Sequence, residues 1–173
     1  LPTTDTSAAT TVSMFDFAQD GKAKLVYRDG TDLPIIDGRI LGDDGLPISD
    51  ADRILATFPN PFSGTLNEYP IVADVDYDGA AEIIMISRVG SPQRQSVVIY
   101  GPAGTAKWAP ARSVWNQVSY NPVYVNDDLT IPSKPISPST TFYGRGSSET
   151  RPFNNFLQQS TSLNREGTMI MLG

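Results

Sequence analysis

The chain has 173 residues, 39% of them hydrophobic, and carries a formal net charge of −6 with no cysteine and no histidine. The acidic excess, in the absence of any basic run, argues against nucleic acid as a partner, because phosphate binding requires clustered lysine and arginine. Without thiols and imidazoles, disulfides, zinc sites built on those residues, and Ser–His–Asp or Cys–His catalysis are all excluded.

The apolar runs are short and are separated by glycine and proline, of which the chain has 14 each. Runs such as KLVY, EIIMIS and SVVIYG are rich in β-branched and aromatic residues, which favours short strands over helices. No run approaches the roughly 20 residues needed to span a bilayer. The chain begins with leucine and has no visible signal peptide, so we interpret it as a mature or partial segment of a longer product.

The chain begins with a polar segment, residues 1–11, with the sequence LPTTDTSAATT. Two interpretations stay open for it. It is either a flexible lead-in from a preceding domain or a strand that pairs with the open sheet edge of another chain.

Residues 12–30 and 70–88 repeat one pattern. Each stretch has an apolar run, an aspartate, an Asp-Gly pair four residues later and a second apolar run. Asp16 aligns with Asp74, an offset of 58 residues given by the difference between 74 and 16. A short strand that ends in glycine follows each unit. Such a period is typical of β-propeller blades or of a β-array. The alternative is a chance similarity between two hairpins with similar turns.

The loop DVDYDGAAE of the second copy predicts a calcium site. Calcium prefers six to eight oxygen ligands from carboxylates, carbonyls and water, and closely spaced carboxylates repel one another without a cation. The loop is no EF-hand, because position twelve counted from its first aspartate is Met85 and the flanks resemble strands. The alternative is a solvated acidic turn without an ion. The candidate ligands are Asp74, Asp76, Asp78, Glu82 and the carbonyl of Ala80.

The first copy of this loop is degenerate. It keeps Asp16 and Asp20, but Ala18 replaces the middle acid and Lys24 stands where the second copy has Glu82. The lysine ammonium could occupy the position of a cation and hold the turn electrostatically. We therefore expect no tight calcium site in this copy.

These residues resemble the FG-GAP, or VCBS-like, repeats of bacterial surface proteins, which are related to the blades of the integrin α-subunit β-propeller. The resemblance is carried by ADVDYDGAAEIIM for the calcium loop and by FDFAQDGKAKLVYRDG for the degenerate copy. Segments similar to SGTLNEYPIVADVD, WAPARSVWNQVSYNPVYVNDDLTIP and FNNFLQQ occur in the same kind of protein, so the resemblance covers most of residues 12–159. The family's Gly-Ala-Pro signature has only a loose analogue here, GPAG.

The resemblance implies an all-β fold of β-propeller-type blades of short antiparallel strands, as a partial or atypical propeller with long irregular loops. After the lead-in, we expect two blades over 12–107, a degenerate one over 12–69 and a calcium-binding one over 70–107. Residues 108–173 form a Trp/Pro-rich segment that completes the module, as an atypical blade or with the help of other segments or chains.

Two tryptophans seven residues apart, Trp108 and Trp115, flank Arg112. One interpretation is an aromatic platform for a sugar or a protein partner, with the arginine binding a carboxylate or stacking on a ring. The other interpretation, which we favour, is that both indoles belong to the core between blades.

Two later segments carry weaker signals. VNDDLTIP, residues 125–132, has adjacent rather than alternate acids, so we predict a turn there before a second ion site. Residues 131–152 are rich in Pro, Ser, Thr and Gly, which is typical of an extended surface segment or linker. Its hydroxyls could carry O-linked sugar, or the segment could lie unmodified against a neighbouring chain.

The resemblance implies a non-catalytic, calcium-stabilised structural or adhesive module that is extracellular or on the cell surface. Its partners would be other protein chains or copies of itself, as a homo-oligomer or filament. The alternative is a lectin-like module that binds carbohydrate through its two tryptophans. We expect no enzyme, because the dense carboxylate cluster is better explained as a metal cage and no histidine is available as a base.

Overall fold

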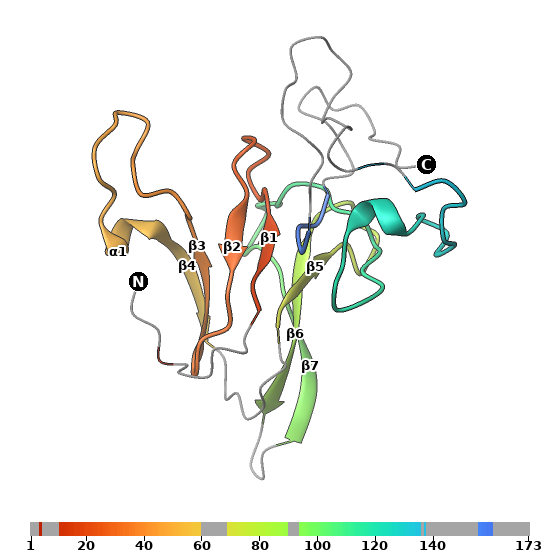
Figure 1. Cartoon of the computed structure of the whole chain (residues 1–173). Helices are drawn as coiled ribbons and strands as arrows, with labels where there is room; N and C mark the ends of the chain where they lie inside the picture. The colour runs from red at the N-terminus through yellow and green to blue at the C-terminus, as the bar shows by residue number, and fades with distance from the viewer. Residues whose placement is uncertain are drawn as a thin grey trace. The chain divides into compact units, whose positions relative to one another are not determined.

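The computed structural model, shown in Figure 1, describes residues 4, 11–59, 69–89, 94–135, 137 and 156–160. Most of the predicted lead-in over 1–11, and most of the Pro/Ser/Thr-rich segment over 131–152, lie outside the described residues. Within the described ranges, no helix combines the length and the apolar character that crossing a membrane requires.

The described chain is nearly all β, which confirms the predicted all-β class, whereas the propeller-type blades stay a prediction. One sheet has four strands in the order β1-β2-β3-β4, and another has three in the order β5-β6-β7; they are called the first and the second sheet below. The strands are β1 (Ser13–Phe15), β2 (Lys24–Val26), β3 (Asp32–Ile36), β4 (Ile54–Pro59), β5 (Ile71–Ala73), β6 (Glu82–Val89) and β7 (Arg94–Tyr100). In the part of the chain that the structure describes, the helical elements are α1 (Asp50–Arg53) and η1 (Pro122–Tyr124).

The register of the strands follows from their apolar alternation. β2 and β3 pair antiparallel, with Leu25 opposite Ile36 and Val26 opposite Ile35. Val26 and Ile35 are buried, whereas their neighbours Leu25 and Ile36 are half-buried, so each strand has two distinct faces. β4 adds to the outer edge of β3, with a bulge opposite Ile35 and Ile36. β6 and β7 form a longer antiparallel hairpin that needs no bulge in its seven registered pairs.

The chain divides into two compact units that interleave along the sequence. The first unit contains Leu1–Met14, Ala23–Ile71 and Ile83–Tyr100, and the second contains Phe15–Lys22, Val72–Glu82 and Gly101–Gly173. The first unit therefore holds β2, β3, β4 and β7 with most of β6, and the second holds both acidic turns. The predicted blade boundaries at 12–69, 70–107 and 108–173 stay predictions.

Within the first unit, the two sheets contact each other. Arg28 is only 1% exposed, and its Nη1 donates a hydrogen bond of 2.6 Å to the carbonyl of Ile86 in β6. The ring of Phe58 in β4 lies 5.0 Å from the ring of Tyr100 in β7, and the tyrosine hydroxyl donates to the carbonyl of Pro59. Such contacts between two sheet faces bury the apolar side chains that alternate along the strands.

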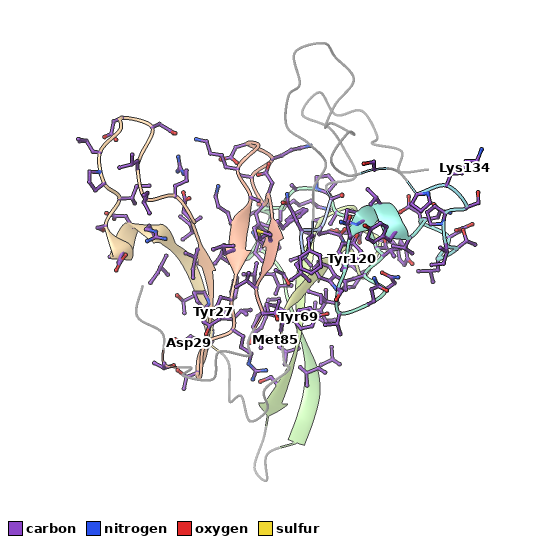
Figure 2. The ribbon with its side chains drawn as sticks, in the orientation of Figure 1. Tyr27, Asp29, Tyr69, Met85, Tyr120 and Lys134 are labelled. Carbon is purple, nitrogen blue, oxygen red and sulfur yellow. The ribbon has the colours of Figure 1, made fainter. Side chains whose placement is uncertain are left out.

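The second unit has a core of small and aromatic side chains. Tyr120, which is labelled in Figure 2, is fully buried and packs with Val114 and Val125. Five further buried apolar residues of the second unit are alanines, which allow backbone segments to approach closely: Ala73, Ala80, Ala81, Ala109 and Ala111. The amide of Ala109 donates to the carbonyl of Phe17, and the amide of Ala81 donates to the carbonyl of Ala109.

Candidate metal centre

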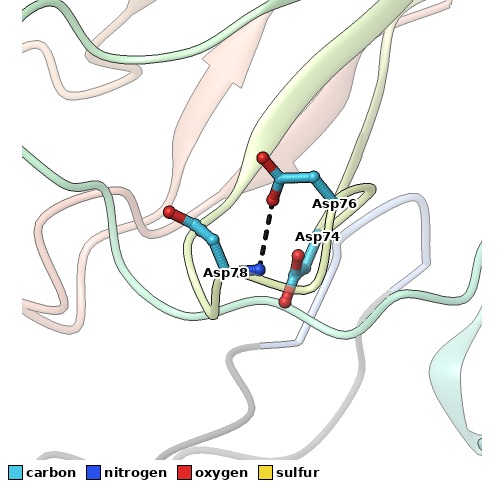
Figure 3. Close-up of side chains that lie close together, drawn as sticks. All are labelled: Asp74, Asp76 and Asp78. Carbon is cyan, nitrogen blue, oxygen red and sulfur yellow. Dashed lines mark hydrogen bonds between the residues drawn. The ribbon is translucent and has the colours of Figure 1, made fainter.

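The predicted calcium loop joins β5 to β6, and it brings three carboxylates together. Oxygens of Asp74, Asp76 and Asp78 all lie within 4.8 Å of one another. Figure 3 shows the three side chains side by side on this loop. The turn needs two left-handed residues, Tyr77 with φ of 61° and Gly79 with φ of 86°. A glycine adopts this conformation without steric cost, which explains the Asp-Gly pair in the sequence.

Backbone amides hold the acidic side chains in place. The amide of Asp78 donates to Asp76 Oδ1 at 3.1 Å, and the amide of Ala80 donates to Asp78 Oδ1 at 2.8 Å. The amide of Gly79 donates to Asp74 Oδ2 at 3.1 Å. Each carboxylate therefore has one oxygen engaged by the turn, so the loop positions the carboxylates before any ligand is considered.

Asp74 Oδ1, the second oxygen of this carboxylate, lies in a different environment. Asp74 is 6% exposed, and its Oδ1 is buried without a hydrogen-bond partner. A buried carboxylate oxygen that has lost its water and found no donor is strongly unfavourable, and proteins compensate such groups with a partner or a metal. A hard divalent cation between Asp74 and the neighbouring Asp76 and Asp78 would supply that partner.

Glu82 and Ala80, the other predicted ligands, border the triad. Glu82 is buried at the start of β6, and its Oε2 accepts a hydrogen bond of 3.1 Å from the amide of Val75. Burial raises the pKa of Glu82, and the negative charges of the three aspartates raise it further. A cation here would reverse that electrostatic effect. Ligation by Glu82 and by the carbonyl of Ala80 stays a prediction.

A lysine outside the predicted ligand set also reaches this loop. Lys107 Nζ lies 2.7 Å from Asp78 Oδ2, and it lowers the pKa of Asp78 through this hydrogen bond. Both groups are exposed to solvent, which weakens the pair. The ammonium supplies positive charge to a site that the sequence assigns to calcium.

The degenerate loop has the same backbone geometry as the acidic one. Gly21 has φ of 80° and donates its amide to Asp16 Oδ2, as Gly79 does to Asp74 58 residues later. The amide of Lys22 likewise donates to Asp20 Oδ1. The predicted repeat is therefore present in the conformation of the loop, which argues against a chance similarity.

The chemistry of the two loops differs nevertheless. Burial raises the pKa of Asp16, and the nearby Asp20 adds to the effect. Three or more acidic, histidine or cysteine side chains that could hold a metal come together, among the described residues, only in the triad of the second loop. Lys24 is buried in β2, and its suggested role at the first turn stays a prediction.

Arg112 and the tryptophans are engaged within the second unit. The guanidinium of Arg112 is buried, bonds Asp127 at 2.7 Å and donates to Tyr120 Oη. It also donates to the carbonyls of Pro122 and Val125. Trp115 stacks on Tyr120 with ring centroids 4.2 Å apart, and Trp108 meets Phe17 edge to face at 4.9 Å. These contacts favour the core interpretation over a displayed platform, and ligand binding by Trp108, Arg112 and Trp115 stays a prediction.

The turn predicted within residues 125–132 is present. The amide of Leu129 donates to the carbonyl of Asn126, and Leu129 has φ of 67°. Asp128 Oδ1 accepts from the amide and the hydroxyl of Thr130. The acids of this segment are thus used by the turn itself and by Arg112.

Sequence reasoning missed Gln159, a buried side chain that joins three separate segments of the second unit. Its Nε2 donates to the carbonyls of Val72, Arg112 and Val114 at 2.9, 3.3 and 3.0 Å. Its Oε1 accepts from Tyr120 Oη at 2.6 Å. The only signal in the sequence was that FNNFLQQ resembles the segment that ends such modules, which says nothing of this side chain.

Together, the two antiparallel sheets and the loop define an all-β protein with a candidate site for a hard divalent cation. Neither the protein-family models nor the curated protein sequences give a match to this chain. Among solved structures, the chain is similar to the crystal structure of the V. cholerae biofilm matrix protein Bap1, with a TM-score of 0.61 and 26% sequence identity. The match covers 92% of this chain and 22% of that protein, so the chain spans about a fifth of its length.

Proposed function

We propose that this chain is a non-catalytic, calcium-stabilised structural or adhesive module of an extracellular or cell-surface protein, built from FG-GAP-type propeller repeats. The observation that carries the proposal is the buried Oδ1 of Asp74, which has no hydrogen-bond partner and lies beside the carboxylates of Asp76 and Asp78. A cation bound there would tie β5 to β6, because the loop connects these two strands.

Calcium suits the donor set better than other metals. The candidate ligands are all oxygens, which excludes the soft thiolate and imidazole sites preferred by zinc and copper. Several carboxylates on a turn that also offers carbonyls fit the high and flexible coordination number of calcium. Magnesium demands stricter octahedral geometry and retains more water.

The propeller assignment is supported by the arrangement of the strands. The first sheet has four strands in sequential order, which is the composition of a propeller blade. The second sheet repeats its first three strands, and the loops between the first and second strand of each sheet share one conformation. Similarity to a biofilm matrix protein supports the extracellular, structural setting.

The experiment that tests this function is calorimetric melting in calcium and in chelator, with a matched pair of variants. Asp78→Asn removes a ligand from the acidic loop, and Asp20→Asn makes the equivalent change in the degenerate loop. We expect calcium at about 100 times its Kd to stabilise the wild type by about 2.7 kcal/mol. The Asp20→Asn protein should keep this shift and the Asp78→Asn protein should lose most of it. An unchanged wild-type midpoint would overturn the proposal.

The carbohydrate-binding alternative has weaker support. Arg112 donates its hydrogen bonds to acceptors within the chain, and Trp115 stacks on the buried Tyr120. Trp108 is half-buried and would be the remaining aromatic for a sugar ring. Glycan-array binding that disappears in Trp108→Ala, with an unchanged melting curve, would favour this alternative.

A further inference from the structure

Among the described residues, one face of the β6–β7 hairpin is apolar and largely exposed. β6 and β7 pair with Ile84 opposite Ile99 and Ile86 opposite Val97, so these four side chains share one face of the second sheet. Ile86, Val97 and Ile99 are 49%, 66% and 52% exposed. We call these four residues the outer face of the second sheet. Contiguous exposed apolar side chains on a sheet mark an interaction surface.

The opposite side of the same hairpin, the inner face of the second sheet, is covered within the first unit. Ile83 and Met85 are buried, and Tyr100, which is opposite Ile83, contacts Phe58 of β4. On the first sheet, this contact involves the face that carries Leu33, because Phe58 is paired with Leu33 across β3 and β4. We call this face the inner face of the first sheet. Arg28 of the first sheet adds to this contact, because its guanidinium donates a hydrogen bond to the carbonyl of Ile86.

The sequence repeat relates the outer face of the second sheet to the inner face of the first sheet. In the first sheet Val26 is opposite Ile35, and 58 residues after Val26 is Ile84, which is opposite Ile99. Continuing the register places Arg28 opposite Leu33, the equivalent of Ile86 opposite Val97. The inner face of the first sheet, Val26, Arg28, Leu33 and Ile35, is at most 5% exposed. These positions of the repeat are thus buried in the first copy, whereas in the second copy Ile86, Val97 and Ile99 are exposed and Ile84 is half-buried.

The complementary surface is also available on this chain. Leu25 is opposite Ile36 in the first sheet, and this pair is equivalent to Ile83 opposite Tyr100 in the second. Tyr27 is likewise equivalent to Met85, and both are labelled in Figure 2. Ile54, which is registered with Ile36, is exposed, and Leu25, Pro34 and Ile36 are half-buried. We call Leu25, Pro34, Ile36 and Ile54 the outer face of the first sheet.

We infer that copies of this chain stack head to tail, with the outer face of the second sheet of one copy packed on the outer face of the first sheet of the next. These two faces are the repeat equivalents of the two inner faces that already pack together inside the first unit. The inference deepens the proposed structural role and rests on it for the repeat architecture. Such a heterologous contact uses different surfaces on the two partners, so it continues into a ring or a filament.

Sedimentation velocity over a range of protein concentrations, in saturating calcium, tests the inference. The wild type should form a concentration-dependent series of oligomers. Val97→Lys and Ile54→Lys each place a charge on one of the two outer faces, and each should weaken self-association at least about tenfold, because an unpaired charge is costly to bury. Val118→Lys, a change at an equally exposed apolar residue outside both faces, should leave it unchanged. Melting curves confirm that each variant is folded.

Mixing the two variants distinguishes head-to-tail stacking from other assemblies. The Val97→Lys protein keeps an intact outer face on its first sheet, and the Ile54→Lys protein keeps one on its second sheet. The mixture should therefore form a one-to-one complex and no larger species. A monomeric wild type, full association by Val97→Lys, or failure of the variants to pair would each overturn the inference. Because calcium-dependent melting is measured separately, loss of stacking with a retained calcium shift leaves the proposed function standing.

Discussion

Lys107 donates a hydrogen bond of 2.7 Å from its ammonium to the carboxylate of Asp78, across 29 residues of sequence. The contact joins the acidic loop to the segment that follows β7. It raises the pKa of Lys107 and lowers that of Asp78, so both groups are charged at neutral pH. A lysine at this position partly neutralises the carboxylates, and it would have to release Asp78 Oδ2 for that oxygen to bind a cation.

Replacement of Lys107 by glutamine should increase calcium affinity. The ammonium competes for one oxygen of Asp78, and its removal leaves that oxygen available to the ion. The pair is exposed and screened, so we expect a gain of roughly two- to fivefold in the calcium association constant, measured by isothermal titration. Lys134→Gln, at an exposed lysine outside the loop, is the matched control. Weaker binding in Lys107→Gln would contradict the competition.

Gly79→Ala should destabilise the loop and weaken ion binding. The added Cβ meets no atom within 4 Å, so the effect comes from the backbone, where φ is +86°. A left-handed conformation costs a non-glycine residue about 1–2 kcal/mol. Thermal melting in chelator would measure this cost. Gly38→Ala is the control, since its Cβ would make only an ordinary contact of 3.7 Å with Leu25; equal losses in the two variants would contradict the conformational argument.

Gln159→Leu should be among the most destabilising single changes in the second unit. It keeps the approximate size of the side chain but leaves the carbonyls of Val72 and Val114 and the hydroxyl of Tyr120 without their buried partner. Unsatisfied buried polar groups cost about 1–3 kcal/mol each, so we expect a loss of at least about 3 kcal/mol in urea unfolding. Gln117→Leu, which loses one exposed hydrogen bond, should change the stability far less.

The Asp37–Arg39 pair should contribute to stability in a defined pH range. Hydrogen bonds from Arg39 are the main cause that lowers the pKa of Asp37 to about 2, from an ordinary value of 3.8. Because the folded-state pKa is depressed, the contribution is fully present above about pH 4 and is lost as the pH falls from about 4 towards 2. In the Asp37→Asn variant, the free energy of unfolding should therefore depend less on pH between about 4 and 2 than in the wild type. Urea unfolding at several pH values measures this dependence.

An exposed aspartate serves as the comparison. Asp32 is the exposed first residue of β3, and within the described residues its carboxylate accepts a hydrogen bond of 3.4 Å from the hydroxyl of Thr31. Asp32→Asn should leave the pH dependence of the free energy of unfolding below about pH 4 the same as in the wild type. If both variants flatten the profile equally, the pH dependence does not come from the Asp37–Arg39 pair.

Local features of the chain were well predicted because their causes are local. The two Asp-Gly turns have the same left-handed glycine and the same amide-to-carboxylate bond, as the repeat indicated. Strands at KLV, EIIMIS and SVVIY follow from β-branched residues that alternate between two faces. Strand β4 and the helical turn α1 before it were not predicted, because ILATFP is mostly exposed and lacks a clear alternation.

The sequence by itself determined the strand-rich class, the repeat and the acidic loop, since backbone conformation and the spacing of carboxylates depend on neighbouring residues. Only the tertiary structure decided that Asp74 is buried with an unpartnered oxygen, that Arg112 is bound by four internal acceptors, and that Gln159 joins segments up to 87 residues apart. It also decided which copy of the repeated sheet face is covered. Burial and partner choice depend on segments distant in sequence, and no local pattern encodes which of them meet.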